Sequence, residues 1–237
     1  MSRPSPAGVP ERGGSEKYVW KEIPGSSHDV LRRRIRALPP GRRLLDLGAA
    51  WGHLGRAVRD RCVYLAGVEG DASVPESARR EYDDWRTADA LSAGEWPERF
   101  DVVVCADVLE HLPDPALLLA RIAGWLAPSG TLLVSVPNVA NATVRLGLLF
   151  GRFRYAERGI LDRTHLRFYT RSTARELLES AGFRVLAAEP TAMPYELAIP
   201  ALSRPPWNAP VRSLAVASAR LFPSLFAYQF VFEAVRR

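Results

Sequence analysis

The sequence predicts an α/β fold built on a doubly wound parallel β-sheet. From Arg43 to Val136, short apolar segments of strand character alternate with segments of helical periodicity. The run FDVVVCA, Phe100–Ala106, is almost entirely apolar, as expected of a strand buried on both faces of a parallel sheet. In LLDLGAAWGHLG, Leu44–Gly55, a strand leads directly into a glycine-containing turn and a helix. Together these patterns imply strand–helix–strand units with right-handed crossovers.

The expected elements follow one another in a regular order. Strands are expected at Arg43–Leu47, Cys62–Glu69, Trp85–Ala88, Phe100–Ala106, Thr131–Val136, Phe183–Glu189 and Phe226–Val235. Helices are expected at Asp29–Leu38, Gly52–Asp60, Ser73–Tyr82, Pro115–Leu126, from near Thr173 to Gly182, and at Val211–Leu221. Pro39 and Pro40 stop the first helix, and a proline suits the first turn of the helix that begins at Pro115. Thr173 and Glu176 have the spacing of a capping box.

The composition fits one globular domain. The chain has 237 residues, of which 47% are hydrophobic, which is enough for a full core. No apolar run reaches the roughly 18 residues of a membrane-spanning helix, and the first thirty residues contain no apolar region of a secretory signal. Cys62 and Cys105 fall in strand-like runs, so we expect buried free thiols and a cytoplasmic protein.

Two segments fall outside the alternation. Residues 1–28 begin with a Pro-, Gly- and Ser-rich stretch, so we expect a disordered or loosely packed segment that precedes a domain over 29–237. Residues 138–170 combine a short helix with a long loop rich in Arg and aromatic residues. A loop of this length in a compact domain usually has a function, so we interpret residues 138–170 as a lid over a substrate site.

Acidic residues stand at or just after the carboxyl ends of four successive expected strands, where such sheets bind their ligands. These residues are Asp46, Glu69, Asp89, Asp107 and Glu110. A dinucleotide would bring a diphosphate that such carboxylates repel, and Ala50 stands where the dinucleotide motif has its second glycine. This disfavours a nicotinamide oxidoreductase. S-adenosylmethionine has no phosphate and carries a sulfonium and an ammonium group, so acidic surroundings favour it.

Five stretches resemble, in order, the motifs of class I S-adenosylmethionine-dependent methyltransferases. They are LLDLGAAWG, GVEGD (Gly67–Asp71), TADAL (Thr87–Leu91), FDVVVCADVLEHLPDP (Phe100–Pro115) and LAPSGTLLVSVPN (Leu126–Asn138). The resemblance implies a Rossmann-like, seven-stranded, mostly parallel sheet whose last strand is antiparallel, with the lid inserted after the fifth strand. The departure from the family pattern is Ala49–Ala50, where many members have Cys-Gly.

The resemblance also implies the cofactor contacts. Asp46, Gly48 and Gly52 would lie against the methionine end of S-adenosylmethionine, and Glu69 would bind the ribose. The complete set of cofactor-binding residues that we expect is Asp46, Gly48, Ala49, Gly52, Glu69, Gly70, Asp89, Ala90 and Asp107. In this set Asp89 and Ala90 lie at the adenine and Asp107 at the edge of the pocket. Independently of the resemblance, Glu69 lies close to the ~20-residue offset from the first motif at which an acid binds ribose hydroxyls in related sites.

Histidines supply the candidates for catalysis. Asp107, Glu110 and His111 are spaced so that a helical turn would place them on one face. His165 lies in GILDRTHLRFYT, Gly159–Thr170, in the lid. These four residues resemble a set in methyltransferases of ubiquinone synthesis and of small-RNA 3′ ends, where a divalent metal holds the substrate hydroxyls; Mg²⁺, Mn²⁺ or Zn²⁺ would suit them. In the alternative, Glu110 and His111 organise the loop without metal and His165 is a general base or an acceptor contact.

The acceptor is less well defined. GILDRTHLRFYT also resembles a segment of bacterial polysaccharide and natural-product methyltransferases. Arg and aromatic residues interleave in the lid, which suits either a phosphate-bearing small molecule or glycan or RNA; a solvated loop face with its aromatics in the core is the third possibility. The preferred hypothesis is that the protein O-methylates a hydroxyl of a sugar or secondary metabolite. The alternatives are an RNA ribose methyltransferase and a catalytically silent, cofactor-binding regulatory subunit. The oligomeric state is left open.

Overall fold

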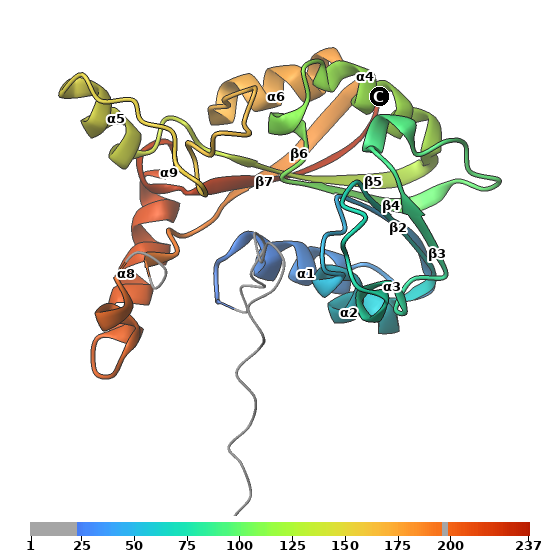
Figure 1. Cartoon of the computed structure of the whole chain (residues 1–237), viewed down its shortest axis with the longest axis horizontal. Helices are drawn as coiled ribbons and strands as arrows, with labels where there is room; N and C mark the ends of the chain where they lie inside the picture. The colour runs from blue at the N-terminus through green and yellow to red at the C-terminus, as the bar shows by residue number, and fades with distance from the viewer. Residues whose placement is uncertain (1–22, 196–198) are drawn as a thin grey trace, which may run out of the picture.

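The computed structural model describes residues 23–195 and 199–237 (Figure 1). We expected a disordered or loosely packed segment at residues 1–28. Residues 1–22 of that segment lie outside the described residues. The remaining part of that segment leads directly into a helix that begins at Ser27 and is capped by the Ser26 side chain. The folded domain therefore includes residues that the sequence assigned to the leading segment.

A seven-stranded sheet forms the centre of the domain, with the order β3-β2-β1-β4-β5-β7-β6. The strands are β1 Arg42–Leu47, β2 Cys62–Glu69, β3 Asp84–Thr87, β4 Phe100–Ala106, β5 Leu126–Pro137, β6 Phe183–Pro190 and β7 Gln229–Arg236. All neighbouring strands are parallel except that β7 runs antiparallel to both β5 and β6. The doubly wound, mostly parallel α/β sheet predicted from the sequence is thereby confirmed.

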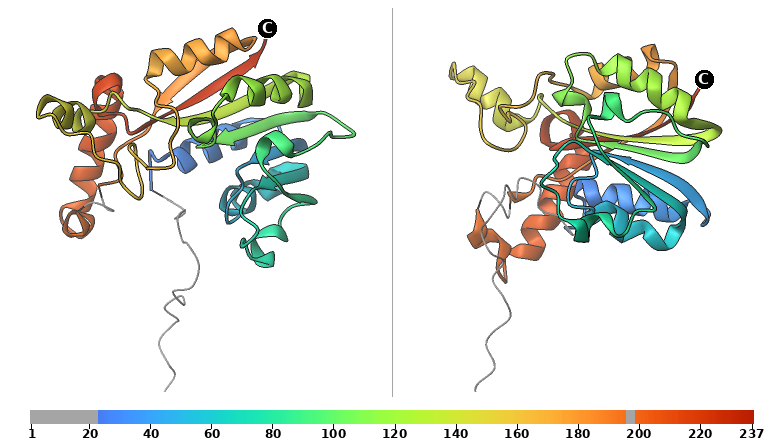
Figure 2. Two further views of the ribbon diagram at one scale, coloured as in Figure 1. Left: turned by 45° about the horizontal axis from the view of Figure 1, so that its top comes forward. Right: turned by 45° about the vertical axis from the view of Figure 1, so that its right-hand side comes forward.

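Helices cover both faces of the sheet (Figures 1 and 2). They are α1 Ser27–Ala37, α2 His53–Val58, α3 Glu76–Arg79, α4 Pro115–Trp125, α5 Ala142–Leu149, α6 Arg171–Ser180, α8 Asn208–Leu221 and α9 Pro223–Phe226. Short 3₁₀ turns are η1 Arg59–Arg61, η2 Ala90–Ser92, η3 Leu109–His111 and η4 Pro200–Ser203. α4 and α6 lie on one face and α1, α2 and α3 on the other, while α5 and α8 project beyond the sheet.

The two faces of the sheet form two apolar clusters. In β4, Val102 and Val104 pack with α1 and α2, whereas Val103 and Cys105 pack with α4 and α6. This alternation follows from the two-residue period of a strand and explains why β4 is apolar on both faces. The arrangement leaves the carboxyl ends of the parallel strands as the place where polar residues gather.

Several expected boundaries differ from the structure. α8 begins at Asn208 rather than Val211, and β7 begins at Gln229 because Phe226, expected to start this strand, lies in α9. The helix expected over Ser73–Tyr82 is only the four-residue α3, because Pro75 precedes its first turn and the chain soon enters β3. The capping box expected at Thr173 and Glu176 is wrong. Thr170 is the capping residue, its Oγ1 accepts from the Thr173 amide, and the Thr173 hydroxyl oxygen accepts from the Thr170 amide. α6 therefore begins before Thr173.

Both cysteines are free, as the sequence predicted. Cys105 is buried in β4 and Cys62 is partly buried at the start of β2. In the described ranges, 23–195 and 199–237, we find no helix with the length and apolar character needed to cross a bilayer.

Candidate functional site

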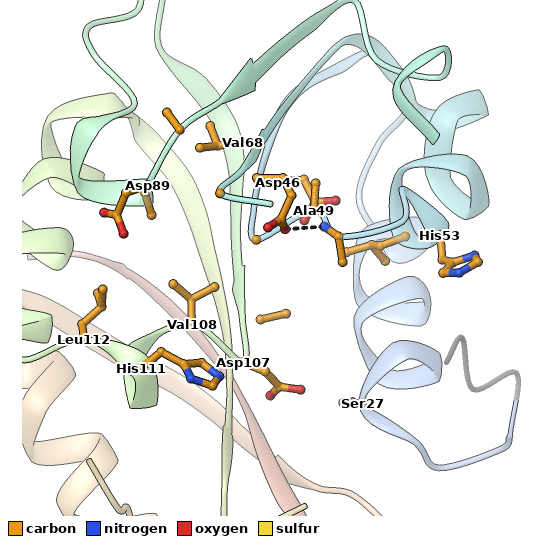
Figure 3. Close-up of a pocket in the computed structure, with 18 of the residues that line it drawn as sticks. Ser27, Asp46, Ala49, His53, Val68, Asp89, Asp107, Val108, His111 and Leu112 are labelled. Atoms are coloured by element: carbon orange, nitrogen blue, oxygen red, sulfur yellow. Dashed lines mark hydrogen bonds between the residues drawn. The ribbon is translucent and has the colours of Figure 1, made fainter. Parts of the chain in front are cut away.

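A cavity of about 280 Å³ opens at the carboxyl ends of β1, β2 and β4 (Figure 3). Its lining includes eight of the nine expected cofactor contacts, namely Asp46, Gly48, Ala49, Glu69, Gly70, Asp89, Ala90 and Asp107. Gly52 is not in the lining. It is the residue before α2, with φ at 68°, and a Cβ there would come within 2.4 Å of the Ala78 carbonyl oxygen. Gly52 shapes the turn from outside the cavity.

Glu69 stabilises the turn after β1 through a hydrogen bond to its backbone. One carboxylate oxygen accepts a hydrogen bond of 2.8 Å from the Ala50 amide, and the other accepts one of 2.8 Å from the Asp71 amide. Ala50 adopts a left-handed φ of 45°, which is unusual for a residue with a Cβ. The hydrogen bond to Glu69 holds it there. Each oxygen of Glu69 keeps a second lone pair, so the carboxylate can accept further hydrogen bonds from a ligand.

Asp46 lies at the floor of the cavity and is only 2% exposed. Its carboxylate accepts a 2.8 Å hydrogen bond from the Tyr82 hydroxyl. Burial raises the pKa of Asp46 to about 7, the Tyr82 hydrogen bond opposes this rise, and the Glu69 charge adds to it. A cation bound nearby would favour the charged carboxylate.

Asp107 lies across the cavity from Asp46, beside His111 (Figure 3). Its φ of 55° places a tight bend directly after β4. The same carboxylate oxygen accepts from the Ser135 hydroxyl at 2.6 Å and from the Gln229 side-chain amide at 2.8 Å. Neighbouring strands β5 and β7 therefore fix Asp107 at the edge of the cavity.

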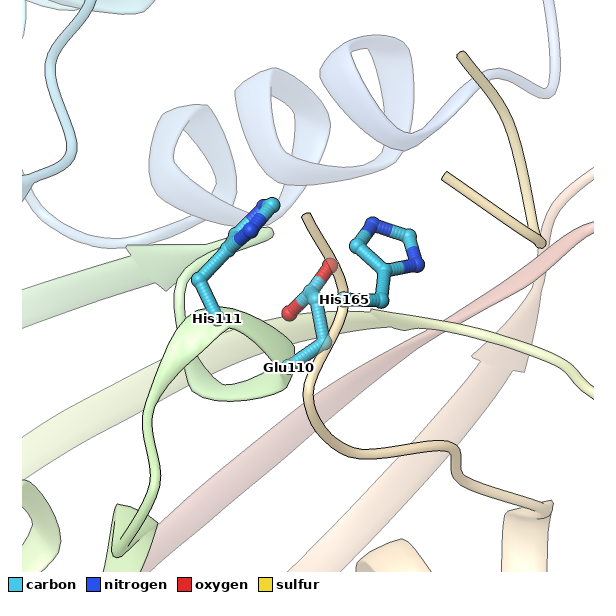
Figure 4. Close-up of side chains that lie close together, drawn as sticks. All are labelled: Glu110, His111 and His165. Atoms are coloured by element: carbon cyan, nitrogen blue, oxygen red, sulfur yellow. The ribbon is translucent and has the colours of Figure 1, made fainter. Parts of the chain in front are cut away.

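Glu110, His111 and His165 form a second cluster next to the cavity (Figure 4). One potential ligand atom from each lies within 4.8 Å of the others. The His111 Nδ1 lies 3.2 Å from the Thr164 carbonyl oxygen, and the His165 Nδ1 lies 3.0 Å from that of Ile160. Since those carbonyls accept from Nδ1–H in the neutral rings, Nε2 of each ring is left as a lone-pair donor.

Glu110 is the most unusual member of this cluster. It is 1% exposed, and neither carboxylate oxygen has a hydrogen-bond partner among the described residues. Burial raises the pKa of Glu110 well above its ordinary value, and the charges of Asp107 and Asp162 raise it further. A buried carboxylate without a partner is costly unless it is protonated or bound to a cation.

The expected common helical face of Asp107, Glu110 and His111 is not formed. Only Leu109–His111 are helical, in the 3₁₀ turn η3, and the left-handed bend at Asp107 precedes it. Asp107 is also outside the group whose ligand atoms come together, which contains Glu110, His111 and His165. The turn directs the Asp107 carboxylate to Ser135 and Gln229 instead.

Hydrogen bonds near His165 connect the lid segment to η3 and to the residues that follow it. The amides of Leu166 and Arg167 donate to the Glu110 carbonyl oxygen at 2.8 and 3.0 Å, and Arg167 Nε donates to the Pro113 carbonyl oxygen at 3.1 Å. His165 is buried by this packing, and burial lowers its pKa. Residues 138–170 therefore place the His165 imidazole against His111, which lines the cavity.

Within the lid, residues 148–158 form a continuous stretch that is open to solvent. Phe153, Tyr155 and Phe168 form a cluster of rings with centroids 5.6 to 6.2 Å apart. Phe150 is 71% exposed, whereas Tyr169 is buried. Most lid aromatics are thus accessible rather than part of the core. The arginines that interleave with these aromatics in the sequence are all exposed. They are Arg145, Arg152, Arg154, Arg158, Arg163, Arg167 and Arg171.

A cationic cavity of about 470 Å³ lies between α5, the start of α6 and α9. Its charged lining consists of Arg145, Arg171 and Arg175, with no acidic residue, and its other polar groups include the hydroxyls of Thr170 and Ser172. Arg145 is anchored, because its Nε donates to the Ala140 carbonyl oxygen at 2.6 Å. We refer to this feature below as the arginine cavity.

Several cavity residues were not expected from the sequence. α1 contributes Ser27 and His28, and α2 contributes His53. No motif marks Ser27 and His28, because α1 reaches the cavity only through tertiary packing. Tyr82 was also missed, since nothing local in the sequence connects it to Asp46.

Comparison with known proteins agrees with this geometry. Residues 20–188 match the family model described as "Methyltransferase domain". A ubiquinone biosynthesis O-methyltransferase of Aeromonas salmonicida is 28% identical over 157 residues, which cover 61% of this chain and 64% of that protein. The chain therefore spans less than two thirds of the length of the curated relatives it matches.

Solved structures share the fold. Magnesium protoporphyrin IX methyltransferase from Synechocystis PCC 6803, with bound S-adenosylhomocysteine, superposes with a TM-score of 0.60 at 16% identity, over 89% of this chain and 82% of that one. An S-adenosylmethionine-dependent methyltransferase from Mesorhizobium loti gives a TM-score of 0.58 at 20% identity, over 90% of this chain and 99% of that one.

Proposed function

Because the chain belongs to the methyltransferase-domain family and has the class I S-adenosylmethionine-dependent methyltransferase fold, we propose that it methylates a hydroxyl of a small-molecule or glycan acceptor. The observation that carries this proposal is the cavity at the strand ends, which is lined by Asp46, Glu69 and Asp89. Those acids suit the sulfonium and ammonium of S-adenosylmethionine and disfavour a dinucleotide diphosphate.

Each wall of the cavity has a role in this proposal. Glu69 binds the ribose hydroxyls with the lone pairs that the Ala50 and Asp71 amides leave available. Asp89 and Ala90 are assigned to the adenine and Asp46 to the methionine end, and all three line the cavity. Asp107 closes the side of the cavity that faces the acceptor.

The reaction is an in-line displacement at carbon. The bond from the methyl carbon to sulfur breaks, its electron pair stays on sulfur, and a bond to the acceptor oxygen forms. The protein contributes alignment and a group that accepts the hydroxyl proton. His165 suits this role, because its Nδ1 is engaged by the Ile160 carbonyl and its lowered pKa keeps Nε2 unprotonated at neutral pH.

A divalent cation is the alternative role that this cluster supports, because the Nε2 lone pair of His165 can either accept the proton or ligate a metal. Glu110, His111 and His165 fit one, since the buried Glu110 carboxylate lacks a partner and both histidines are oriented by backbone carbonyls, as metal-ligating histidines are. When bound there, Mg²⁺, Mn²⁺ or Zn²⁺ would hold and polarise the acceptor hydroxyl.

The acceptor that we favour carries a phosphate and is a sugar or secondary metabolite. The arginine cavity and the exposed lid arginines support a phosphate group. The curated relatives, named as ubiquinone biosynthesis O-methyltransferases, support an oxygen nucleophile. The free thiols support a reducing compartment such as the cytoplasm. RNA is the second candidate acceptor, because the lid also presents accessible aromatics beside its arginines.

Calorimetry followed by a turnover screen tests the proposal. S-adenosylhomocysteine should bind and NAD should bind far more weakly. Methyl transfer from labelled S-adenosylmethionine should then be measured against phosphorylated and free glycans, phenolic metabolites and single-stranded RNA. NAD binding without S-adenosylhomocysteine binding would refute the proposed cofactor. Cofactor binding without turnover of any acceptor class would favour the regulatory subunit.

A further inference from the structure

Tyr82 lies directly beneath the turn that follows β1. It comes from the segment between α3 and β3, and its hydroxyl donates to Asp46 at 2.8 Å. Tyr82 is 8% exposed and Asp46 is 2% exposed, so this hydrogen bond is shielded from water. The described residues show no other hydrogen bond to the Asp46 carboxylate.

Two glycines make room for the tyrosine ring. A Cβ at Gly55 would lie 2.4 Å from the Tyr82 hydroxyl oxygen, and a Cβ at Gly67 would lie 2.8 Å from the ring. Neither glycine lines the cofactor cavity. Their lack of a side chain therefore serves the tyrosine rather than the ligand.

Trp85 completes the enclosure of the ring. It packs edge to face against Tyr82, with centroids 5.1 Å apart and planes at 73°. A ring held on several sides cannot turn away without disturbing α2, β2 and β3. The hydroxyl is thereby directed at one place, the Asp46 carboxylate.

Few groups around Asp46 stabilise its charged carboxylate. Glu69 on β2 raises its pKa, and the Tyr82 hydroxyl is the interaction that lowers it. The charge of Asp46 in turn affects the thiols of Cys62 and Cys105, and Arg56 on α2 acts on Tyr82 rather than on Asp46. The other titratable groups that line this cavity are His28, His53, Asp89, Asp107 and His111.

We propose that Tyr82 is a positioning residue that holds the Asp46 carboxylate toward the ammonium group of the bound cofactor and sets the pH range over which cofactor affinity changes. This inference rests on the proposed function, because it requires an amino-acid ammonium at the methionine end of the cavity. The charged carboxylate attracts that ammonium and the protonated form does not.

The sign of the effect follows from the raised pKa of Asp46, about 7. Affinity for a ligand with an ammonium should increase as the pH rises through 7, because the carboxylate becomes charged. Without the Tyr82 hydroxyl, the pKa of Asp46 rises further. The gain in affinity should then occur at higher pH.

The experiment compares Tyr82→Phe with the wild type by calorimetry between pH 5.5 and 8.5. The probes are S-adenosylhomocysteine, which carries the ammonium, and methylthioadenosine, which has the same adenosine but no amino-acid part. Tyr64→Phe is the matched control, because its hydroxyl lies 3.4 Å from Asp84, outside the cavity lining. At pH 7 we expect Tyr82→Phe to bind S-adenosylhomocysteine roughly tenfold or more weakly, to bind methylthioadenosine as the wild type does, and to shift the pH dependence upward.

A second variant keeps the test decisive if Tyr82→Phe is unstable. Asp46→Asn retains the shape and removes the titrating group, so its S-adenosylhomocysteine affinity should be weak and nearly independent of pH. Added to Asp46→Asn, Tyr82→Phe should cause little further loss, since the two residues act as a unit.

Three outcomes would overturn the inference. Equal weakening of both probes in Tyr82→Phe would mean that the tyrosine only supports the fold. If the pH dependence of affinity is unchanged in Tyr82→Phe or in Asp46→Asn, the Tyr82–Asp46 pair does not control cofactor binding. If the wild type binds methylthioadenosine but gains nothing from the amino-acid part, the ammonium is not recognised, whereas failure to bind either probe would refute the proposed function itself.

Discussion

The imidazole rings of His111 and His165 lie edge to face, with centroids 4.9 Å apart and planes at 71°. One ring belongs to η3, directly after β4, and the other to the lid. Their contact joins the cofactor cavity, which His111 lines, to the segment that we propose covers the acceptor. Whether this junction holds a cation or moves a proton can be decided by experiment.

If Glu110, His111 and His165 hold a divalent cation, chelation should abolish turnover and leave S-adenosylmethionine binding nearly unchanged. Mg²⁺, Mn²⁺ or Zn²⁺ should restore turnover and raise the melting temperature of the wild type. Glu110→Gln should lose that thermal stabilisation, because the charged ligand is missing. A matched control is Glu76→Gln, an exposed carboxylate on α3. Full activity in chelator would exclude the metal.

If His165 is instead the general base, His165→Ala should lower kcat by roughly 10²–10⁴ and leave cofactor affinity intact. Burial lowers the pKa of His165 below its ordinary value. The neutral, competent ring therefore predominates at neutral pH, and kcat should fall only as the pH drops through that lowered pKa. The variant should lose this limb of the pH–rate profile. Full activity of His165→Ala, together with insensitivity to chelator, would leave alignment as the main source of catalysis.

Glu69→Ala should weaken S-adenosylhomocysteine binding by about 1.5–3 kcal/mol, or roughly ten- to a hundredfold. The variant loses a hydrogen bond from a charged group to the ribose and also the two amide contacts that hold the turn. Glu69→Gln should lose less, because one side-chain oxygen still accepts. Calorimetry measures both variants, and an unaffected affinity in Glu69→Ala would remove Glu69 from the cofactor site.

Arg154→Ala and Arg171→Ala should raise the KM for the acceptor and leave cofactor affinity unchanged. Arg154 lies in the exposed part of the lid and Arg171 lines the arginine cavity. Arg163→Ala should act in the same direction, although Arg163 also pairs with Glu157. Arg184→Ala, on β6, is a matched control. Equal loss of cofactor and acceptor binding would mean that the lid only supports the fold, and salt-sensitive binding of single-stranded RNA would favour the RNA alternative.

The sheet and the cofactor side of the site could be predicted because they depend on local patterns. The alternation of strands and helices determines where strand ends lie. Asp46 and Glu69 lie within the last two residues of β1 and β2, and Asp89 follows β3 closely. Parallel strands present their carboxyl ends at one edge, so residues distant in the sequence were expected together without knowledge of side-chain contacts.

The remaining features depend on backbone detail or on long-range packing. The left-handed bend at Asp107 removes this residue from the expected cluster, and the spacing of Glu110 and His111 alone does not reveal that bend. Tyr82 meets Asp46 only after β2 and β3 have paired, so no motif connects them. α3 is shorter than its periodicity suggested, because Pro75 and the entry into β3 limit it.

The position of β7 has a consequence for how the chain acquires its fold. β7 follows every other strand in sequence, yet it occupies an interior position between β5 and β6. Until it is synthesised, β5 has a bare edge of unpaired amides and carbonyls, and β6 has no neighbour. The contacts that close the sheet are therefore among the most distant in sequence, which slows folding. Before β7 pairs, the edge of β5 is exposed, and exposed strand edges favour aggregation.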